Sequence, residues 1–378
     1  MMTMTRNSES TAAAGYLFVA FELSERTWKL GFTVGECRRP RMRQIATGAV
    51  DQVATEVSRA KARFGLTGDA PVVSCYEAGR EAFWVHRWAV AQGWTNYVVD
   101  SSSIEVNRRA RRAKTDRLDL GGLLRLLERY VHGEDGVWRV VRVPSEAEED
   151  ARHLHRLREA LQQERTRLIN RLHGLLTTHG VHVPVRADFL ARVATARRWD
   201  ATPLPQGIVQ RLRAVWAQLE FLTTQLAEVD AARAALIVDR ETPTGRWVGQ
   251  LQTLRGIGSV GAWALTTEIF GWRQIRNGRE LGALVGMVPA PYQSGETAHD
   301  QGITRAGNRH VRRMIVQLAW SWLRYQPNSA LSRWYRERFG HSRRLRRIGI
   351  VALARKLLIA WWRYVETGLV PEGAVLKA

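Results

Sequence analysis

The chain has little cysteine, few acids and no long uncharged apolar run. Its two cysteines, Cys37 and Cys75, are too few for a disulfide framework or a cysteine zinc site. No stretch of about 18 apolar residues is present, and charged residues directly follow the apolar run at 12–21. We therefore expect no membrane span and no signal peptide, and we expect a cytoplasmic protein.

Acids are also scarce relative to basic residues. The 57 Lys and Arg against 36 Asp and Glu leave a net charge of +21 over 378 residues, and residues 301–347 hold twelve arginines but one acid, Glu337. Genomic base composition could explain arginine in place of lysine, but not an excess over acids. A chain this basic repels itself unless a polyanion neutralises it. The composition favours binding to nucleic acid and, in a bacterium, association with the nucleoid.

Residues 1–143 alternate between strand-like and helix-like segments. Strands are predicted at 16–24, 28–34, 44–50, 71–76 and 97–99, and helices at 51–64, 80–92 and 115–130. Three strands come first, and then helices and strands alternate. This order predicts an α/β fold, a ribonuclease-H-like mixed sheet with helices packed on its faces.

Four acids fall at the ends of these predicted elements. Glu22 ends the first strand, Glu77 ends the fourth, and Asp116 and Asp119 lie three apart on the last helix. Acids at such positions also serve solubility and capping. In this topology, however, the first and fourth strands are neighbours, so the four carboxylates could converge. Clustered carboxylates need a cation between them, and oxygen ligands favour Mg²⁺ or Mn²⁺. A phosphate-binding run precedes the aspartates: Arg108, Arg109, Arg111, Arg112 and Lys114.

Residues 144–240 predict a helical hairpin that acts as a scaffold. A Pro-Ser pair followed by acids at 144–150 starts one helix, which runs to about 179. The next helix carries apolar residues spaced alternately by four and three, the heptad pattern of a coiled coil: Ile208, Leu212, Val215, Leu219, Leu222, Leu226 and Val229. We expect the histidines of the first helix at the surface or in partner contacts rather than on a metal: His153, His155 and His173.

Residues 241–378 predict a mainly helical domain with a glycine-rich turn. Residues 256–261 match G-x-G-x-x-G, but no strand precedes them, so we reject a dinucleotide site. Arg255, Gly256 and Gly258 are more typical of a helix-hairpin-helix turn, whose backbone N–H groups bind a nucleic-acid phosphate. A plain glycine turn between helices is the alternative.

Ser294 lies between a Pro-rich turn and a glycine, so a tight loop could present its hydroxyl. A serine needs activation to attack phosphorus, and no G-x-S-x-G elbow surrounds this one. Local chemistry alone therefore favours an ordinary surface serine. Polar residues beyond it could clamp a phosphate: Arg305, Asn308, Arg309, Arg312 and Arg313.

Taken in order, these segments resemble the insertion-sequence transposases that combine a RuvC-like DEDD domain, a coiled coil and a C-terminal serine domain, the bridge-RNA-guided recombinases. The matching phrases are FELS at 21–24, CYEAGR at 75–80, KTDRLD at 114–119, LRGIG at 254–258, and PYQSGE and ITRAGNRHVRR within 291–313.

The resemblance implies that Glu22, Glu77, Asp116 and Asp119 bind Mg²⁺ and that Ser294 is the nucleophile. It further implies a covalent phosphoserine link to DNA, and a structured guide (bridge) RNA that pairs with donor and target DNA. It also implies a homo-oligomer, dimer or tetramer, in which the acidic domain of one protomer completes the serine site of another. Glu22 departs from the family, which commonly has Asp there; the longer side chain can still reach a metal, with a different geometry.

Two other function classes stay open on the sequence alone. A metal-dependent, RuvC-like junction-resolving endonuclease would use the same four acids with water as the nucleophile. A non-catalytic scaffold would only bind nucleic acid and would need no Mg²⁺. In all three cases we expect binding that weakens steeply with salt.

Overall fold

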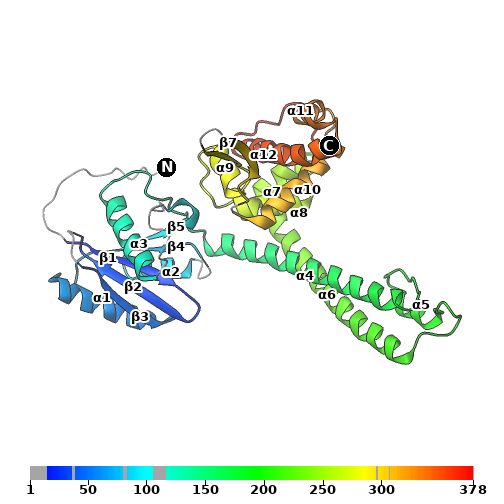
Figure 1. Ribbon diagram of the computed structural model, residues 1–378, viewed down its shortest axis with the longest axis horizontal. Helices are drawn as coiled ribbons and strands as arrows, with labels where there is room; N and C mark the ends of the chain where they lie inside the picture. Colours follow the sequence, from blue (N-terminus) through cyan, green and yellow to red (C-terminus); the bar gives the residue numbers. More distant parts are fainter. Residues whose placement is uncertain are drawn as a thin grey trace. The chain divides into compact units, whose positions relative to one another are not determined.

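The computed structural model of the chain describes residues 15–35, 39–79, 83–104, 116–294, 297–305 and 307–377, and for 102, 116–119, 291–294 and 297–301 it describes the backbone alone. The chain divides into two compact units, which meet in sequence between Pro144 and Ser145 (Figure 1). None of the helices in these described ranges is long and apolar enough to cross a membrane.

The first unit is built on a five-stranded mixed sheet. Its strands are β1 (Leu17–Leu23), β2 (Thr27–Thr33), β3 (Arg41–Ala46), β4 (Val72–Glu77) and β5 (Thr95–Val99), in the order β3-β2-β1-β4-β5. β1 pairs antiparallel with β2 and parallel with β4. The expected mixed α/β architecture is therefore confirmed, as is the prediction that the first and fourth strands are neighbours.

Four helical segments connect or cover these strands: α1 (Val50–Phe64), α2 (Trp84–Ala91), the 3-10 turn η1 (Ser101–Ser103) and α3 (Asp116–Val131). Leu120, Leu123 and Leu127 of α3 are buried against Phe18 and Ala20 of β1. The third strand differs from its prediction: it covers 41–46 rather than 44–50. Gly48, with φ +77°, turns the chain there, and α1 begins two residues later.

The second unit begins with the predicted pair of long helices, α4 (Glu146–Thr177) and α6 (Gln206–Val238), joined through α5 (Phe189–Thr195). Ser145 and Glu148 form the capping box that starts α4. The apolar seam expected on α6 packs against α4 and α5, with Leu212 fully buried. One expectation for α4 is wrong: His155, expected at the surface or in a partner contact, is buried at 5% exposure.

The remaining elements form a second core. They are α7 (Pro243–Thr253), α8 (Ser259–Leu265), the π-helical turn η3 (Thr266–Phe270), α9 (Gly278–Leu284), β6 (Pro289–Ser294), β7 (Thr297–Ile303), α10 (Arg309–Tyr325), α11 (Ala330–Phe339) and α12 (Arg343–Thr367). Trp263, Trp322 and Trp361 are fully buried among them. The second turn of α4 joins this core through Ala151.

Candidate functional site

The carboxyl ends of β1 and β4 bring two of the predicted acids together. The parallel register pairs Ala20 with Cys75 and Phe21 with Tyr76. Glu22 and Glu77 are the next residues on each strand, so they lie side by side at the same edge of the sheet. Side chains alternate between faces along a strand. Both glutamates therefore share the face of Ala20 and Cys75, which is the face covered by α3.

Helix α3 begins at that same edge. A Cβ added to Gly31, which pairs with Ala20, would lie 3.0 Å from Leu120 Cγ near the start of the helix. At the other end, the ring of His132, just beyond the helix, lies 6.4 Å from that of Phe18, near the start of β1. The helix thus runs antiparallel to β1, and its first turn, Asp116 to Asp119, begins toward the carboxyl end of β1.

A pocket of about 500 Å³ opens at this edge, lined by Glu22, Ser24, Glu25, Arg26, Thr27 and Lys29. Glu22 is half-buried there, with its Oε2 4.0 Å from Lys29 Nζ across the β1–β2 pair. Carboxylate oxygens facing an open pocket suit a hard divalent cation. Among the described side chains, which exclude those of Asp116 and Asp119, no group of three or more metal ligands occurs. The tetrad therefore stays a prediction, supported by the placement of its backbone.

The basic run from Arg108 to Lys114 lies outside the described residues. The glycine-rich turn lies within them, between α7 and α8, and a helix rather than a strand precedes it. Gly256, with φ +91°, packs its Cα against α10, where its carbonyl accepts a hydrogen bond from Ser321 Oγ. Gln326 donates to the Arg255 carbonyl at 3.0 Å. Part of this turn is therefore held against α10, while Gly258 stays exposed.

Ser294 is the last residue of β6, opposite Thr297 of β7. It stands at the tip of a β-hairpin that the sequence did not predict. From β7 the chain reaches α10 through a tight connection, in which Arg305 has φ +55° and Gly307 has φ +92°. A Cβ at Gly307 would lie 2.2 Å from the Leu284 carbonyl oxygen, so glycine is required there.

The polar residues after the hairpin differ in how free their side chains are to contact a phosphate. Arg305 and Arg309 are exposed. Arg312 is partly buried and donates to the Val285 carbonyl at 2.9 Å, and Arg313 lies 3.9 Å from Glu159. Asn308 caps α10, with its side-chain oxygen accepting from the His310 and Val311 amides. Arg305 and Arg309 are therefore the better candidates for a phosphate contact.

Sequence reasoning missed a buried acid beneath this connection. Glu268, 5% exposed on the π-helical turn η3, accepts two hydrogen bonds from Arg156 of α4, at 2.9 and 3.2 Å. Its other neighbour is Asn308, whose Nδ2 donates to Oε2 at 3.1 Å. Burial raises the pKa of Glu268, but Arg156, together with His155 and Arg152, outweighs that effect and holds the pKa below its ordinary value. The available signal was a lone acid within the apolar segment 260–270.

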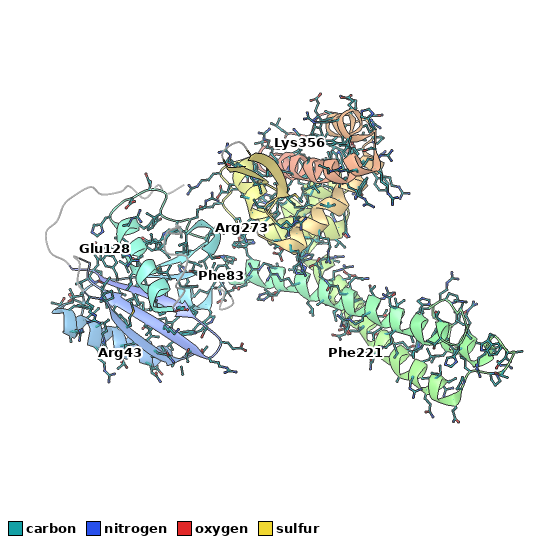
Figure 2. The ribbon with its side chains drawn as sticks, viewed as in Figure 1. Arg43, Phe83, Glu128, Phe221, Arg273 and Lys356 are labelled. Atoms are coloured by element: carbon teal, nitrogen blue, oxygen red, sulfur yellow. The ribbon has the colours of Figure 1, made fainter. Side chains whose placement is uncertain are left out.

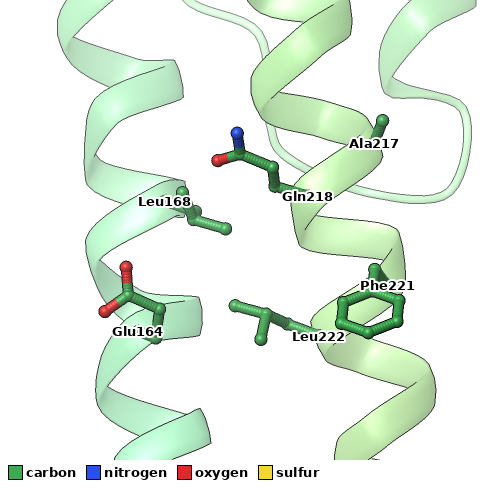
Figure 3. Close-up of a pocket in the computed structure, with 6 residues that line it drawn as sticks. All are labelled: Glu164, Leu168, Ala217, Gln218, Phe221 and Leu222. Atoms are coloured by element: carbon green, nitrogen blue, oxygen red, sulfur yellow. The ribbon is translucent and has the colours of Figure 1, made fainter.

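The long helices carry a separate apolar depression of about 470 Å³, shown in Figure 3 and lined by Glu164, Leu168, Ala217, Gln218, Phe221 and Leu222. Phe221 is 65% exposed on α6. No ionisable group other than Glu164 lines it, so it offers little for phosphate chemistry.

Comparison with known proteins connects both units to one family. A sequence model described as "Transposase IS116/IS110/IS902 family" matches residues 249–334, and the model DEDD_Tnp_IS110, described as "Transposase", matches residues 37–180. The chain is 38% identical to "Putative transposase y4rJ" of Sinorhizobium fredii, over 96% of this chain and 95% of that protein. It is 30% identical to "Transposase for insertion sequence element IS1328" of Yersinia enterocolitica, over 55% of this chain and 60% of that one. On these matches, the chain belongs to the IS110/IS116 family of transposases.

Proposed function

We propose that this transposase cuts and rejoins donor and target DNA with Ser294 as nucleophile, assisted by a Mg²⁺ or Mn²⁺ site on Glu22, Glu77, Asp116 and Asp119. The site belongs to a ribonuclease-H-like (RuvC-like) domain, the α4–α6 pair is a coiled-coil scaffold, and the active form is a homo-oligomer, dimer or tetramer. A structured guide RNA, paired with both DNAs, supplies the target sequence. The supporting observation is the shared edge at which β1 and β4 end and α3 begins.

The proposed step balances without an external reagent. Ser294 Oγ loses its proton and bonds to phosphorus, while the bond from phosphorus to a deoxyribose oxygen breaks and that oxygen takes up a proton. The hydroxyl of a second DNA end then reverses the step and releases the serine. A divalent ion held by the four carboxylates would supply charge neutralisation at the phosphodiester. Arg305 and Arg309, exposed beside the hairpin, would bind the phosphate under attack.

Trapping the covalent intermediate tests this proposal. We expect a DNA adduct on Ser294, identified by mass spectrometry of the digested protein, in the presence of Mg²⁺ and an RNA transcribed from the element. Ser294→Ala should lose both adduct and strand exchange. The matched control is Thr297→Ala, the residue opposite on the hairpin, which should keep the adduct.

Two outcomes would contradict the proposal. If Ser294→Ala still cleaves DNA while Asp116→Ala does not, the chain is a nuclease that uses water. If Ser294→Ala and Asp116→Ala bind DNA as the parent protein does, and no Mg²⁺-dependent cleavage or strand exchange is detected, the chain is a nucleic-acid-binding scaffold.

A further inference from the structure

The corner between α11 and α12 carries a concentrated positive charge that the proposed catalytic step does not use. Between residues 333 and 347 the sequence has seven arginines and one acid, Glu337. We call the arginines the corner patch: Arg333, Arg336, Arg338, Arg343, Arg344, Arg346 and Arg347. All seven are exposed. Most of the patch lies beyond residue 334, where the match to the family's sequence model ends.

No acid in the described part of the chain forms an ion pair with these arginines. Arg333 and Arg346 donate to backbone carbonyls, at 2.8 and 3.2 Å, and Arg336 donates to the Pro327 carbonyl. Those hydrogen bonds hold the side chains but leave their charge uncompensated. The other four, Arg338, Arg343, Arg344 and Arg347, make no side-chain hydrogen bond or ion pair within the described ranges. Some arginines elsewhere in the same unit are paired with acids, as Arg158 is with Asp230 at 2.7 Å.

The position of the charge opposes helix stability. Ser342 caps α12, and Arg343, Arg344 and Arg346 follow in its first turn, where no acid is present. The amino end of a helix carries a partial positive charge, so cations there are unfavourable and anions are favourable. The patch therefore weakens the isolated chain, and an anionic partner would remove that repulsion.

The corner is also rigid. Tyr335 donates its hydroxyl to the Arg346 carbonyl at 3.1 Å, which ties α11 to α12. A Cβ on Gly349 would lie 2.3 Å from the ring of Phe339, so the two helices pack with no space between them there. Lys356, labelled in Figure 2, lies over the Trp334 ring at 4.8 Å and ties the helices together a second time. The backbone that carries the arginines is thus fixed before any partner binds, which lowers the entropy cost of binding.

We propose that the corner patch binds the phosphate backbone of duplex DNA, at a surface separate from the Ser294 hairpin. Arginines match phosphate oxygens in a bidentate manner, and contacts to the backbone orient a duplex without reading its sequence. This inference rests on the proposed function only in taking DNA as the partner. The patch would hold the DNA that flanks the reacting phosphodiester.

The test compares two variants of the full-length protein with equal loss of charge. The patch variant carries Arg338→Gln, Arg343→Gln, Arg344→Gln and Arg347→Gln. The control variant removes four exposed arginines of the long helices and their connection, Arg171→Gln, Arg186→Gln, Arg211→Gln and Arg213→Gln, which also have no ion pair in the described ranges. Affinity for a random-sequence 30-bp duplex and for a structured RNA of equal charge is measured by fluorescence anisotropy between about 50 and 200 mM salt.

Each phosphate contact adds about 0.9 to the magnitude of the slope of log affinity against log salt concentration. Removing four contacts should therefore reduce that magnitude by about 3 to 4 on duplex DNA. The melting temperature of the patch variant should not fall, because the charges opposing the α12 dipole are gone. The inference is overturned if the slope is unchanged, if the control variant loses as much, or if only the RNA slope changes. Failure of the Ser294 adduct would leave these slopes intact, so the two proposals fail separately.

Discussion

Arg156 and Glu268 are 112 residues apart in sequence and form a two-pronged ion pair that joins α4 to the π-helical turn η3. The two ends differ in solvent exposure: the Arg156 side chain is 54% exposed and that of Glu268 only 5%. Through Asn308, the same carboxylate reaches the first turn of α10, directly after the Ser294 hairpin. This pair therefore connects the helical scaffold to the segment that follows the proposed nucleophile.

The unequal burial predicts unequal effects of removing each partner. Arg156→Leu leaves a buried carboxylate with less compensation and should lower the free energy of unfolding by about 2–3 kcal/mol. Glu268→Leu leaves a guanidinium that water can reach and should cost less. Urea denaturation followed by tryptophan fluorescence measures both, with Arg167→Leu as control, since its pair with Glu164 is exposed at both ends. Equal losses of unfolding free energy in Arg156→Leu and Glu268→Leu would contradict the argument that the burial of Glu268 makes the two effects unequal.

Both the oxygen and the nitrogen of the Asn308 side-chain amide should contribute to the stability of the fold. Its oxygen caps α10 and its nitrogen donates to Glu268. Asn308→Ala removes both contacts and should cost about 1–2 kcal/mol. Asn308→Ser keeps a capping oxygen and should recover about half of that loss.

Asn308→Asp provides the sharper comparison. It keeps the cap but places a second carboxylate beside Glu268, so it should be less stable than Asn308→Ser at pH 7. The like charge raises the pKa of one carboxyl of the pair, so protonation should relieve the repulsion and narrow the gap in stability between the two variants from pH 7 to pH 4. Melting temperatures at both values measure it. An Asp variant as stable as the Ser variant at pH 7 would show that the Glu268 contact is unimportant.

His155 should make the second unit less stable as the pH falls. Burial lowers its pKa below 6.5, against the opposite pull of Glu159 and Glu268. Arg158 and Arg156 also face it and lower the pKa further. The folded chain thus binds fewer protons than the unfolded one, so this contribution is complete above pH 6.5 and is lost as the pH drops through the folded value.

Replacing this histidine should flatten the pH profile. Between pH 7.5 and 5.5, His155→Gln should remove a slope of at most about 1.4 kcal/mol per pH unit from the free energy of unfolding. His153→Gln, at an exposed position on the same helix, is the control. If the free energy of unfolding of His155→Gln varies with pH as steeply as that of the parent protein, a group other than His155 causes the pH dependence.

The sequence was most informative where structure is local. The heptad spacing on α6 predicted its buried seam, because one face of a helix is readable from periodicity alone. The order of strands and helices likewise predicted that the first and fourth strands pair, which places Glu22 beside Glu77. Both predictions needed only patterns along the chain and the few topologies that such patterns allow.

Contacts between segments far apart in the sequence could not be predicted in this way. The sequence predicted a Pro-rich turn before Ser294, but residues 289–294 form β6. Among the described strands β6 pairs with β7 alone, and proline is tolerated on such an edge strand. His155 and Glu268 looked unremarkable because their burial depends on segments more than 100 residues apart. The side-chain arrangement of Asp116 and Asp119 cannot follow from spacing either, since it depends on how the first turn of α3 meets the sheet.

Lys29 should weaken metal binding at the proposed acidic site. Its Nζ lies 4.0 Å from Glu22 Oε2 and lines the same pocket. A fixed positive charge repels an incoming divalent cation, although water and salt screen much of that effect at this half-exposed position. Lys29→Met should therefore tighten Mn²⁺ binding by roughly two- to tenfold, as measured by electron paramagnetic resonance titration.

Three further variants separate charge from other effects of this substitution. Lys29→Arg keeps the charge and should leave the Mn²⁺ affinity near the parent value. Lys61→Met removes a lysine that lies on α1, outside the pocket, and donates to the Gly68 carbonyl; it should leave the Mn²⁺ affinity unchanged. Glu22→Gln should abolish the gain from Lys29→Met, because the two effects act through one carboxylate. If Lys29→Met instead loosens Mn²⁺ binding, the ammonium helps to organise Glu22 and the cation does not bind beside it.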